Sequence, residues 1–219
     1  MNQDIPKGIM IQKDGSYAIT VEVPGAVIST ELLELFTRIS REKNALIHPT
    51  TAQKMMILNL DLNTAKEVLE QLESLGVPVR KARDISTARV CVGKPYCKLA
   101  FRDTFSLSKA LFEETARILT APKFKIAISG CPACCSWANT VDLGFVGVRS
   151  GYKVFIGGHG GVRPTAGIEI TTIQSDDEAI LILKKAVAIF NETVKRRARF
   201  DRVIKKIGLD EIKKRLGVK

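Results

Sequence analysis

Five cysteines in two groups are the feature that most restricts how this chain can fold. Cys91 and Cys97 are spaced C-x5-C, and Cys131 and Cys135, about 35 residues further on, are spaced C-x3-C. Four thiolates are what a [4Fe–4S] cube requires, one for each iron. A structural zinc site also takes four thiolates, but usually from pairs with shorter spacings than the first one here. We therefore expect two distant loops to converge on an iron–sulfur cluster, with zinc or unligated cysteines as the alternatives.

The fifth cysteine, Cys134, is expected to be a small buried thiol beside the cluster rather than a ligand. An odd number of cysteines argues against a framework built only of disulfides. In a reducing compartment, clustered cysteines more often bind metal or carry out redox work. The chain begins without an apolar signal segment, and no apolar run approaches the roughly 20 residues of a membrane span. These features predict a cytoplasmic protein with no membrane contact.

Residues 1–80 show hydrophobic periodicities that switch between those of strands and helices. Alternation over 17–23 predicts a half-buried strand, with Ala18, Thr20 and Glu22 on its more polar face. The further predicted elements are a helix capped by Ser29 or Thr30 and running to about Lys43, strands over 45–48 and 53–60, and a helix that a Thr64-x-x-Glu67 capping box starts and Gly76 ends. The order strand, helix, two strands, helix predicts a ferredoxin-like half domain.

Residues 81–219 predict a second, mixed α/β domain, which makes the whole chain α+β. A basic connector over 79–88 marks the boundary between the two domains. The predicted elements are helices over 106–119 and 176–190, strands over 123–129, 141–148 and 152–156, a Ser175-x-x-Glu178 capping box, and a basic helical tail over 191–219 with a break at Gly208 and a new cap at Asp210.

Two stretches near the cysteines offer positive charge and backbone amides to an anion. Lys123 and Lys125 open a predicted strand one residue apart, so both can project from the same side; an exposed strand edge is the alternative. The glycines of the stretch 157–161 allow the backbone to approach a ligand closely and to form an anion-binding nest. His159 and Arg163 add positive charge to this loop.

The chain carries 34 basic and 23 acidic residues, a formal net charge of +11. Such a surface attracts nucleic acid, an acidic protein or a small oxyanion. Basic runs at 195–199 and 213–215 can equally form a solvated helix face. Aromatic residues make up only 6% of the chain, and no nucleic-acid recognition motif is visible. A zinc-stapled nucleic-acid-binding module is therefore the less favoured interpretation, and no nucleic-acid partner is expected.

Around the cysteines the sequence resembles the sirohaem-dependent sulfite and nitrite reductase family, and in particular its small single-module sulfite reductases. The likeness extends from about Tyr17 onward. The residues that carry it are the two cysteine pairs with Gly130 and Pro132, the Lys123-Phe124-Lys125 strand, the stretches 142–147 and 154–158, and Thr50-Thr51-x-Gln53.

The resemblance implies a sirohaem and a [4Fe–4S] cluster that together reduce sulfite to sulfide with six electrons, with nitrite to ammonia as a second reaction. Cys91, Cys97, Cys131 and Cys135 are then the cluster ligands, and Cys135 also bridges to the sirohaem iron. Lys123, Lys125 and Arg89 are the expected catalytic residues. The residues expected to bind the sirohaem carboxylates are Arg83, Arg89, Gly157, Gly158, His159, Gly160, Gly161 and Arg163.

The resemblance also implies partners. Larger members of the family contain two such modules, so a chain with one module is expected to form a homodimer with sirohaem near the interface. A small acidic electron carrier such as a ferredoxin is the expected donor. The alternative from another class is a non-catalytic electron-transfer subunit that carries only the cluster, which would not need Lys123 and Lys125.

Overall fold

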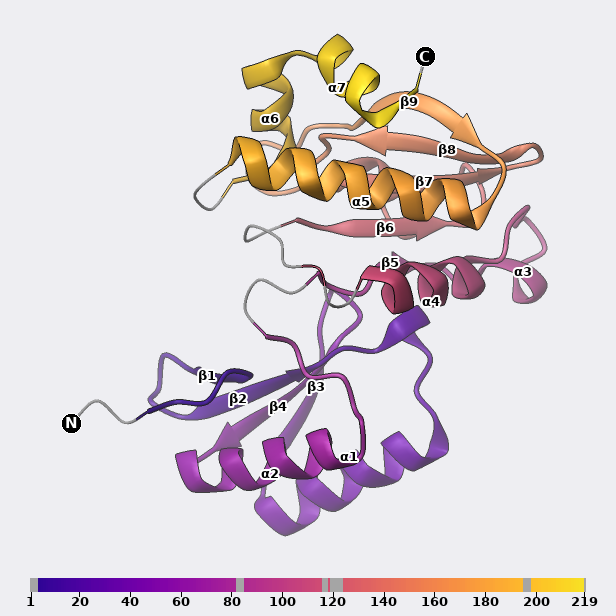
Figure 1. Cartoon of the computed structure of the whole chain (residues 1–219). Helices are drawn as coiled ribbons and strands as arrows, with labels where there is room; N and C mark the ends of the chain where they lie inside the picture. The colour runs from indigo at the N-terminus through magenta and orange to yellow at the C-terminus, as the bar shows by residue number, and fades with distance from the viewer. Residues whose placement is uncertain (1–3, 82–84, 116–117, 119–123, 195–197, 219) are drawn as a thin grey trace. The chain divides into compact units, whose positions relative to one another are not determined.

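The computed structural model describes residues 4–81, 85–115, 118, 124–194 and 198–218. The chain divides into two compact units, Met1–Ala82 and Arg83–Lys219 (Figure 1). No helix within the described ranges is long and apolar enough to cross a membrane.

The first unit is a four-stranded antiparallel sheet whose strand order is β1-β2-β4-β3. Figure 1 shows both of its long helices on the same face of this sheet. Two segments pair with the same edge of β2: residues 9–11 pair with its first half, and Val79 forms a bridge to Val21 in its second half. The elements are β1 (Ile9–Ile11), β2 (Tyr17–Val21), a 3-10 turn (Pro24–Ala26), α1 (Thr30–Lys43), β3 (Leu46–Pro49), β4 (Met55–Leu60) and α2 (Leu62–Ser74).

The predicted strand over 17–23 is confirmed in β2, but its more polar face is not exposed to solvent. Ala18, Thr20 and Glu22 are all at most 5% exposed. Glu22 tolerates this burial because its carboxylate forms ion pairs with Lys54 and with Arg80, the second at 2.9 Å. Burial lowers the pKa of Lys54, and the Glu22 carboxylate opposes that change.

The start of α1 agrees with the sequence, whereas the start of α2 does not. Ser29 caps α1, and its hydroxyl accepts the Leu32 N–H at 3.3 Å. The capping box predicted at Thr64 is wrong, because Asp61 caps a helix that begins at Leu62 and accepts two backbone N–H groups. A carboxylate at the N-cap is a strong acceptor and lies favourably in the helix dipole, so the earlier residue determines the start. Glu67 instead forms an ion pair with the end of α1.

The second unit contains a mixed five-stranded sheet with the order β5-β6-β7-β8-β9. Strands β5, β6 and β7 are parallel, and β7, β8 and β9 are antiparallel. Two of these strands, β5 and β9, were not predicted from the sequence. The elements are β5 (Arg89–Val90), α3 (Gly93–Tyr96), α4 (Thr104–Thr115), β6 (Ile126–Ser129), a 3-10 turn (Ala138–Thr140), β7 (Leu143–Val148), β8 (Gly151–Ile156), β9 (Ile168–Ile173), α5 (Asp176–Thr193), α6 (Phe200–Ile207) and α7 (Leu209–Leu216).

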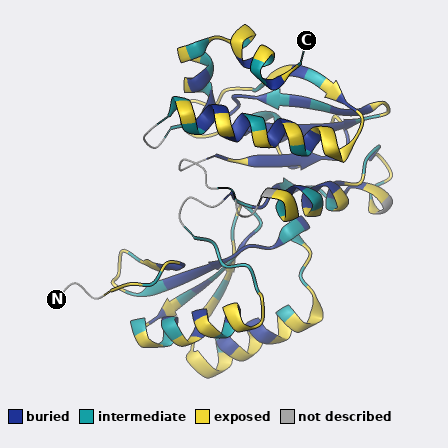
Figure 2. Cartoon of the chain, in the orientation of Figure 1, coloured by how far each residue is buried: buried dark blue, intermediate teal, exposed yellow. Residues whose placement is uncertain are grey.

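Helix α5 organises the core of the second unit, and Figure 2 shows its buried and exposed sides. It contacts α4, α6 and α7. At its end, the Phe190 ring stacks on the Phe200 ring at 5.9 Å and meets the edge of Phe124 at 5.3 Å. Both Phe190 and Phe200 are fully buried. This aromatic cluster fixes the start of α6 against the main helix.

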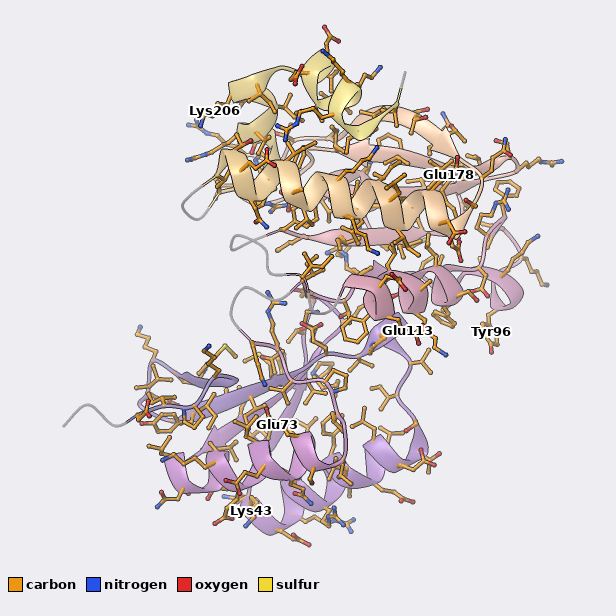
Figure 3. The ribbon with its side chains drawn as sticks, viewed as in Figure 1. Lys43, Glu73, Tyr96, Glu113, Glu178 and Lys206 are labelled. Atoms are coloured by element: carbon orange, nitrogen blue, oxygen red, sulfur yellow. The ribbon has the colours of Figure 1, made fainter. Side chains whose placement is uncertain are left out.

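The predicted capping box of α5 is confirmed, since Ser175 and Glu178 exchange hydrogen bonds with each other's backbone N–H groups. Figure 3 labels Glu178 at this end of the helix. The predicted break at Gly208 is also confirmed, because it ends α6 and caps α7 with φ at 85°. Asp210 as the new cap is wrong: it lies in the first turn of α7, where no side chain caps the helix.

Candidate functional site

The two cysteine loops leave the same edge of the second sheet. Cys91 directly follows β5, and Cys131 follows Gly130 after β6. The two strands are parallel neighbours, so their carboxyl ends meet at one edge. The loops are hydrogen-bonded there: the Cys91 N–H donates to the Ile128 carbonyl at 3.3 Å, and the Gly130 N–H donates to Cys91 Sγ at 3.1 Å.

Three glycines allow the loops to approach this closely. A Cβ on Gly130 would lie 3.0 Å from the Cα of Gly93, which belongs to the first cysteine loop. A Cβ on Gly147 of β7 would lie 2.4 Å from the Gly130 carbonyl oxygen. Both approaches are backbone against backbone, so no side chain can rotate away to make room. The contact between the loops therefore depends on residues without a side chain.

Each cysteine loop is also fixed internally by backbone hydrogen bonds. The Cys97 N–H donates to the Gly93 carbonyl at 2.9 Å, which closes the turn of α3. The Cys134 N–H donates to the Cys131 carbonyl at 3.1 Å, and the Trp137 N–H donates to the Cys134 carbonyl at 2.8 Å. Cys134 and Trp137 both have φ at 54°, in the left-handed region. These two residues flank Cys135 and set the path of the second loop.

The thiols of the four predicted ligands differ in exposure. Cys131 is buried, Cys91 and Cys97 are half-buried, and Cys135 is exposed, and none of them forms a disulfide. Within the described residues, no group of three or more His, Cys, Asp or Glu side chains is close enough to hold a metal ion. The structure does bring the two cysteine loops together, through the hydrogen bond from Gly130 to Cys91. Their four free thiols are the donor set that a [4Fe–4S] cluster takes.

Cys134 packs beside the four candidate ligands, against other residues of the second unit. It is half-buried against a small apolar cluster that includes Ala138 and Val146. Its thiol donates to the Asn139 carbonyl oxygen Oδ1 at 3.5 Å. A small polarisable side chain suits such a position.

Arg89 joins the first strand of the sheet to the second cysteine loop. Its Nε donates to the Ser136 carbonyl at 2.7 Å, and its guanidinium lies 4.8 Å above the Trp137 ring. Burial lowers the pKa of Arg89, and the nearby Cys134 opposes this shift. An arginine remains charged across the working pH range, so Arg89 places a fixed cation against the carbonyl of Ser136, the residue that follows Cys135. Trp137 was not predicted from the sequence, where its only signal is an aromatic residue two positions after a predicted ligand.

Lys125 lies just before β6, and its side chain is exposed. Its backbone is held on both sides: its N–H donates to Asp142 Oδ2 at 2.8 Å, and its carbonyl accepts the Leu143 N–H at 3.2 Å. The strand predicted over 123–129 is therefore shorter in the described residues. Lys123 and Arg83 fall outside the described residues.

The glycine loop begins where β8 ends. A Cβ on Gly158 would lie 2.6 Å from the Asn139 carbonyl oxygen, whereas one on Gly160 would meet nothing within 4 Å. The loop folds back on itself, because His159 and Thr165 exchange backbone hydrogen bonds of 2.8 and 2.9 Å. Gly157 and Gly161 have positive φ values of 76° and 121°.

His159 carries the one buried side-chain polar atom without a hydrogen-bond partner in the described part of the chain, its Nδ1. Buried polar atoms are otherwise nearly always partnered, so this nitrogen indicates a site for a polar group. Arg163, further along the same loop, is exposed. Together with the open glycines, these two side chains fit the binding of an anionic ligand.

Two known protein families match the chain, one in each of its two units. The family described as "Nitrite and sulphite reductase 4Fe-4S domain" matches residues 81–219. The family described as "Nitrite/Sulfite reductase ferredoxin-like half domain" matches residues 10–75.

Relatives of very different lengths match the chain. The "Sulfite reductase, assimilatory-type" of Nitratidesulfovibrio vulgaris is 27% identical over 215 residues, which cover 96% of this chain and 97% of that protein. The "Nitrite reductase (NADH) large subunit" of Escherichia coli is 31% identical over 70% of this chain, but this match covers only 18% of that protein. The structure of the Mycobacterium tuberculosis NirA protein has a similar fold, with a TM-score of 0.77 at 22% identity over 97% of this chain and 42% of that one.

Proposed function

Because the chain belongs to the family of nitrite and sulphite reductase 4Fe-4S domains, we propose that it is an oxidoreductase that reduces sulfite to sulfide. The observation that carries this proposal is the match along nearly the full length of both chains to an assimilatory-type sulfite reductase. Nitrite is the second candidate substrate, since nitrite reductases are also among the relatives.

The cofactors that we propose are a [4Fe–4S] cluster and a sirohaem. Four cysteines would hold the cluster: Cys91, Cys97, Cys131 and Cys135. Residues of the connector, of β5 and of the glycine loop would hold the sirohaem carboxylates: Arg83, Arg89, Gly157, Gly158, His159, Gly160, Gly161 and Arg163. The unpartnered Nδ1 of His159 and the fixed guanidinium of Arg89 support this assignment. When bound, the two groups supply the electron transfers of the reaction.

The chain's own part in the reaction is to bind the oxyanion and to deliver protons. Six electrons and six protons convert sulfite to sulfide and release its three oxygens as water. Each lysine Nζ, of Lys123 and of Lys125, can hold a proton, donate a hydrogen bond to a leaving oxygen, and be reprotonated from water. Their positive charge stabilises the negative charge that develops on that oxygen. Arg89 adds a third cation, which its contacts to Ser136 and Trp137 hold in one orientation.

The proposed donor is a small acidic electron carrier such as a ferredoxin, which a chain of net charge +11 would attract. We further propose a homodimer, a cytoplasmic location, and a boundary between the two domains at residues 80–81. Light scattering after size exclusion tests the dimer, because a cofactor-loaded monomer would contradict it.

The test of the proposed function is Lys125→Ala in the full-length holoprotein, purified without oxygen. The wild type should contain iron, acid-labile sulfide and a tetrapyrrole, and should reduce sulfite with a chemical electron donor. The variant should keep all three constituents and lose about 10²-fold in the rate of sulfite reduction, the usual scale for one proton donor or electrostatic contact.

Lys109→Ala is the matched control. Lys109 is an exposed lysine on α4 whose Nζ lies 3.8 Å from Glu113, so its loss should leave the rate unchanged. A wild type that holds both cofactors and does not reduce sulfite would overturn the proposed function. An unchanged rate in Lys125→Ala would remove Lys125 from the mechanism.

A further inference from the structure

One buried carboxylate, that of Asp142, connects three distant segments of the second unit. Asp142 is fully buried and directly precedes β7. Its Oδ2 accepts the Lys125 N–H at 2.8 Å, and its Oδ1 accepts the Phe200 N–H at 2.7 Å. The Nε of Arg199 donates to both oxygens, at 3.0 and 2.9 Å. A single side chain therefore holds the backbone before β6 and the start of α6.

The same pair also reaches the glycine loop. The Nη2 of Arg199 donates to the Gly158 carbonyl at 3.2 Å, and the backbone carbonyl of Asp142 accepts the Gly157 N–H at 3.0 Å. Asp142 and Arg199 thus contact both stretches for which we propose a role in binding and reduction: the lysine before β6 and the beginning of the glycine loop.

The contacts require a charged carboxylate. Burial raises the pKa of Asp142, while Arg199 and the N–H groups of Phe200 and Lys125 oppose that shift. The Asp142 carboxylate accepts from three N–H donors: the backbone N–H groups of Lys125 and Phe200 and the Nε of Arg199. A proton on either oxygen would therefore place a donor against a donor. Arg199 supplies the compensating charge, and its side chain is only 17% exposed.

We propose that Asp142 and Arg199 form a positioning pair that fixes two parts of the site: Lys125, in the geometry needed to bind the oxyanion, and the Gly157–Gly158 backbone, in the geometry needed to bind the carboxylates of the cofactor. Neither residue touches the substrate in this account. Asp142 sets the path of the chain from which the Lys125 side chain extends, and Arg199 sets the orientation of the Gly158 peptide. The proposal rests on the proposed function, because it assigns the two residues to that same site.

The simpler account is that the pair only fastens α6 to the sheet. The two accounts differ in what a weakened pair does to the site. If the pair only anchors α6, weakening it lowers the stability and leaves the folded protein with normal anion affinity. A positioning pair changes the affinity for sulfite and the reactivity of Lys125 in protein that is still folded.

The principal variant is Asp142→Asn, which keeps the size of the side chain but places an amide N–H₂ group against N–H donors. Arg199→Lys is the milder second variant, since it keeps the charge but cannot donate to Asp142 and Gly158 in the same geometry. Leu183→Ala is the stability control, because Leu183 is a fully buried residue of α5 that the network above does not include.

Each full-length protein is characterised in three ways. Thermal unfolding gives the thermal midpoint. Optical titration and steady-state kinetics of the holoprotein give the sulfite affinity, kcat and KM, and mass spectrometry gives the acylation rate of the Lys125 amine. We expect Asp142→Asn to lose at least about tenfold in kcat/KM and in sulfite affinity, with a changed acylation rate. Arg199→Lys should show a smaller loss in the same direction. Leu183→Ala should have a lower thermal midpoint but the sulfite affinity, kcat, KM and Lys125 acylation rate of the wild type.

If Asp142→Asn does not retain cofactors, Arg199→Lys and the acylation rate in cofactor-free protein decide the question. Wild-type sulfite affinity, kcat/KM and Lys125 acylation in these variants would overturn the positioning role while leaving the proposed function intact. A cofactor-loaded wild type that does not reduce sulfite overturns the proposed function itself, and this inference with it.

Discussion

Gly147→Ala tests whether the contact between the two cysteine loops is required for the iron–sulfur site. Gly147 lies in β7 and does not have a positive φ, so alanine is allowed by the backbone and only the space around it matters. The added Cβ would lie 2.4 Å from the Gly130 carbonyl oxygen, whereas ordinary contact begins at 3.4 Å. Gly130 or β7 must therefore move by about 1 Å.

The size of the effect follows from what Gly130 holds. Its N–H donates to Cys91 Sγ at 3.1 Å, and a displacement of about 1 Å breaks this bond. Overpacking of this kind costs about 1–3 kcal/mol, which lowers the thermal midpoint of a unit of this size by about 3–15 °C. Metal–ligand distances tolerate only about 0.2 Å, so the iron bound per chain should fall well below that of the wild type.

The assay is iron and acid-labile sulfide per chain after anaerobic reconstitution, together with thermal unfolding. Lys109→Ala again serves as the control, because its exposed ion pair contributes little to stability. A Gly147→Ala protein with wild-type iron content and a thermal midpoint within about 1 °C of the wild type would refute the reasoning. The close approach of the loops would then be an incidental feature of the sheet edge.

Two further predictions concern the support of the second unit. Phe190→Ala should lower the free energy of unfolding by about 3–5 kcal/mol, because it removes a fully buried ring packed on Phe124 and Phe200; a loss below about 1.5 kcal/mol in denaturant unfolding would contradict this. The N–H groups of Gln174 and Ser175 hold the pKa of Glu178 below its usual 4.5, so its carboxylate stabilises the fold above that pH and loses this effect as the pH falls through the lowered value. The difference in thermal midpoint between the wild type and Glu178→Gln should therefore shrink from pH 7 to pH 3, and a difference independent of pH would count against it.

Local signals in the sequence predicted those helix ends for which the deciding residue lies within one turn. The Ser175 capping box and the break at Gly208 are of this kind. The start of α2 was misplaced because the capping-box pattern predicted the cap at Thr64, whereas Asp61, three residues earlier, accepts the N–H groups of the first turn. The strand β5 has only two residues, too few to produce a periodicity, and its existence depends on pairing with β6.

The chemical character of the site was more accessible from the sequence than its construction. The cysteine spacings and the glycine loop are contiguous patterns, so they could be recognised as candidate ligands without a fold. The network around Asp142 could not, because Arg199 lies 57 residues further along the chain and only the packing of α6 brings it back. Trp137 was missed for a related reason: its contact with Arg89 joins the second cysteine loop to the first residue of β5, 48 residues earlier in the chain.

The long span between Asp142 and Arg199 also affects when the second unit can mature during synthesis. Ribosomes add about 5–20 residues per second, so Arg199 emerges some 3–11 s after its carboxylate partner. During that interval Asp142 is a nascent-chain carboxylate without its guanidinium, and Lys125 and Gly158 lack part of their support. We therefore expect cofactor insertion to follow the synthesis of Arg199, although all four candidate cluster cysteines precede it in the chain.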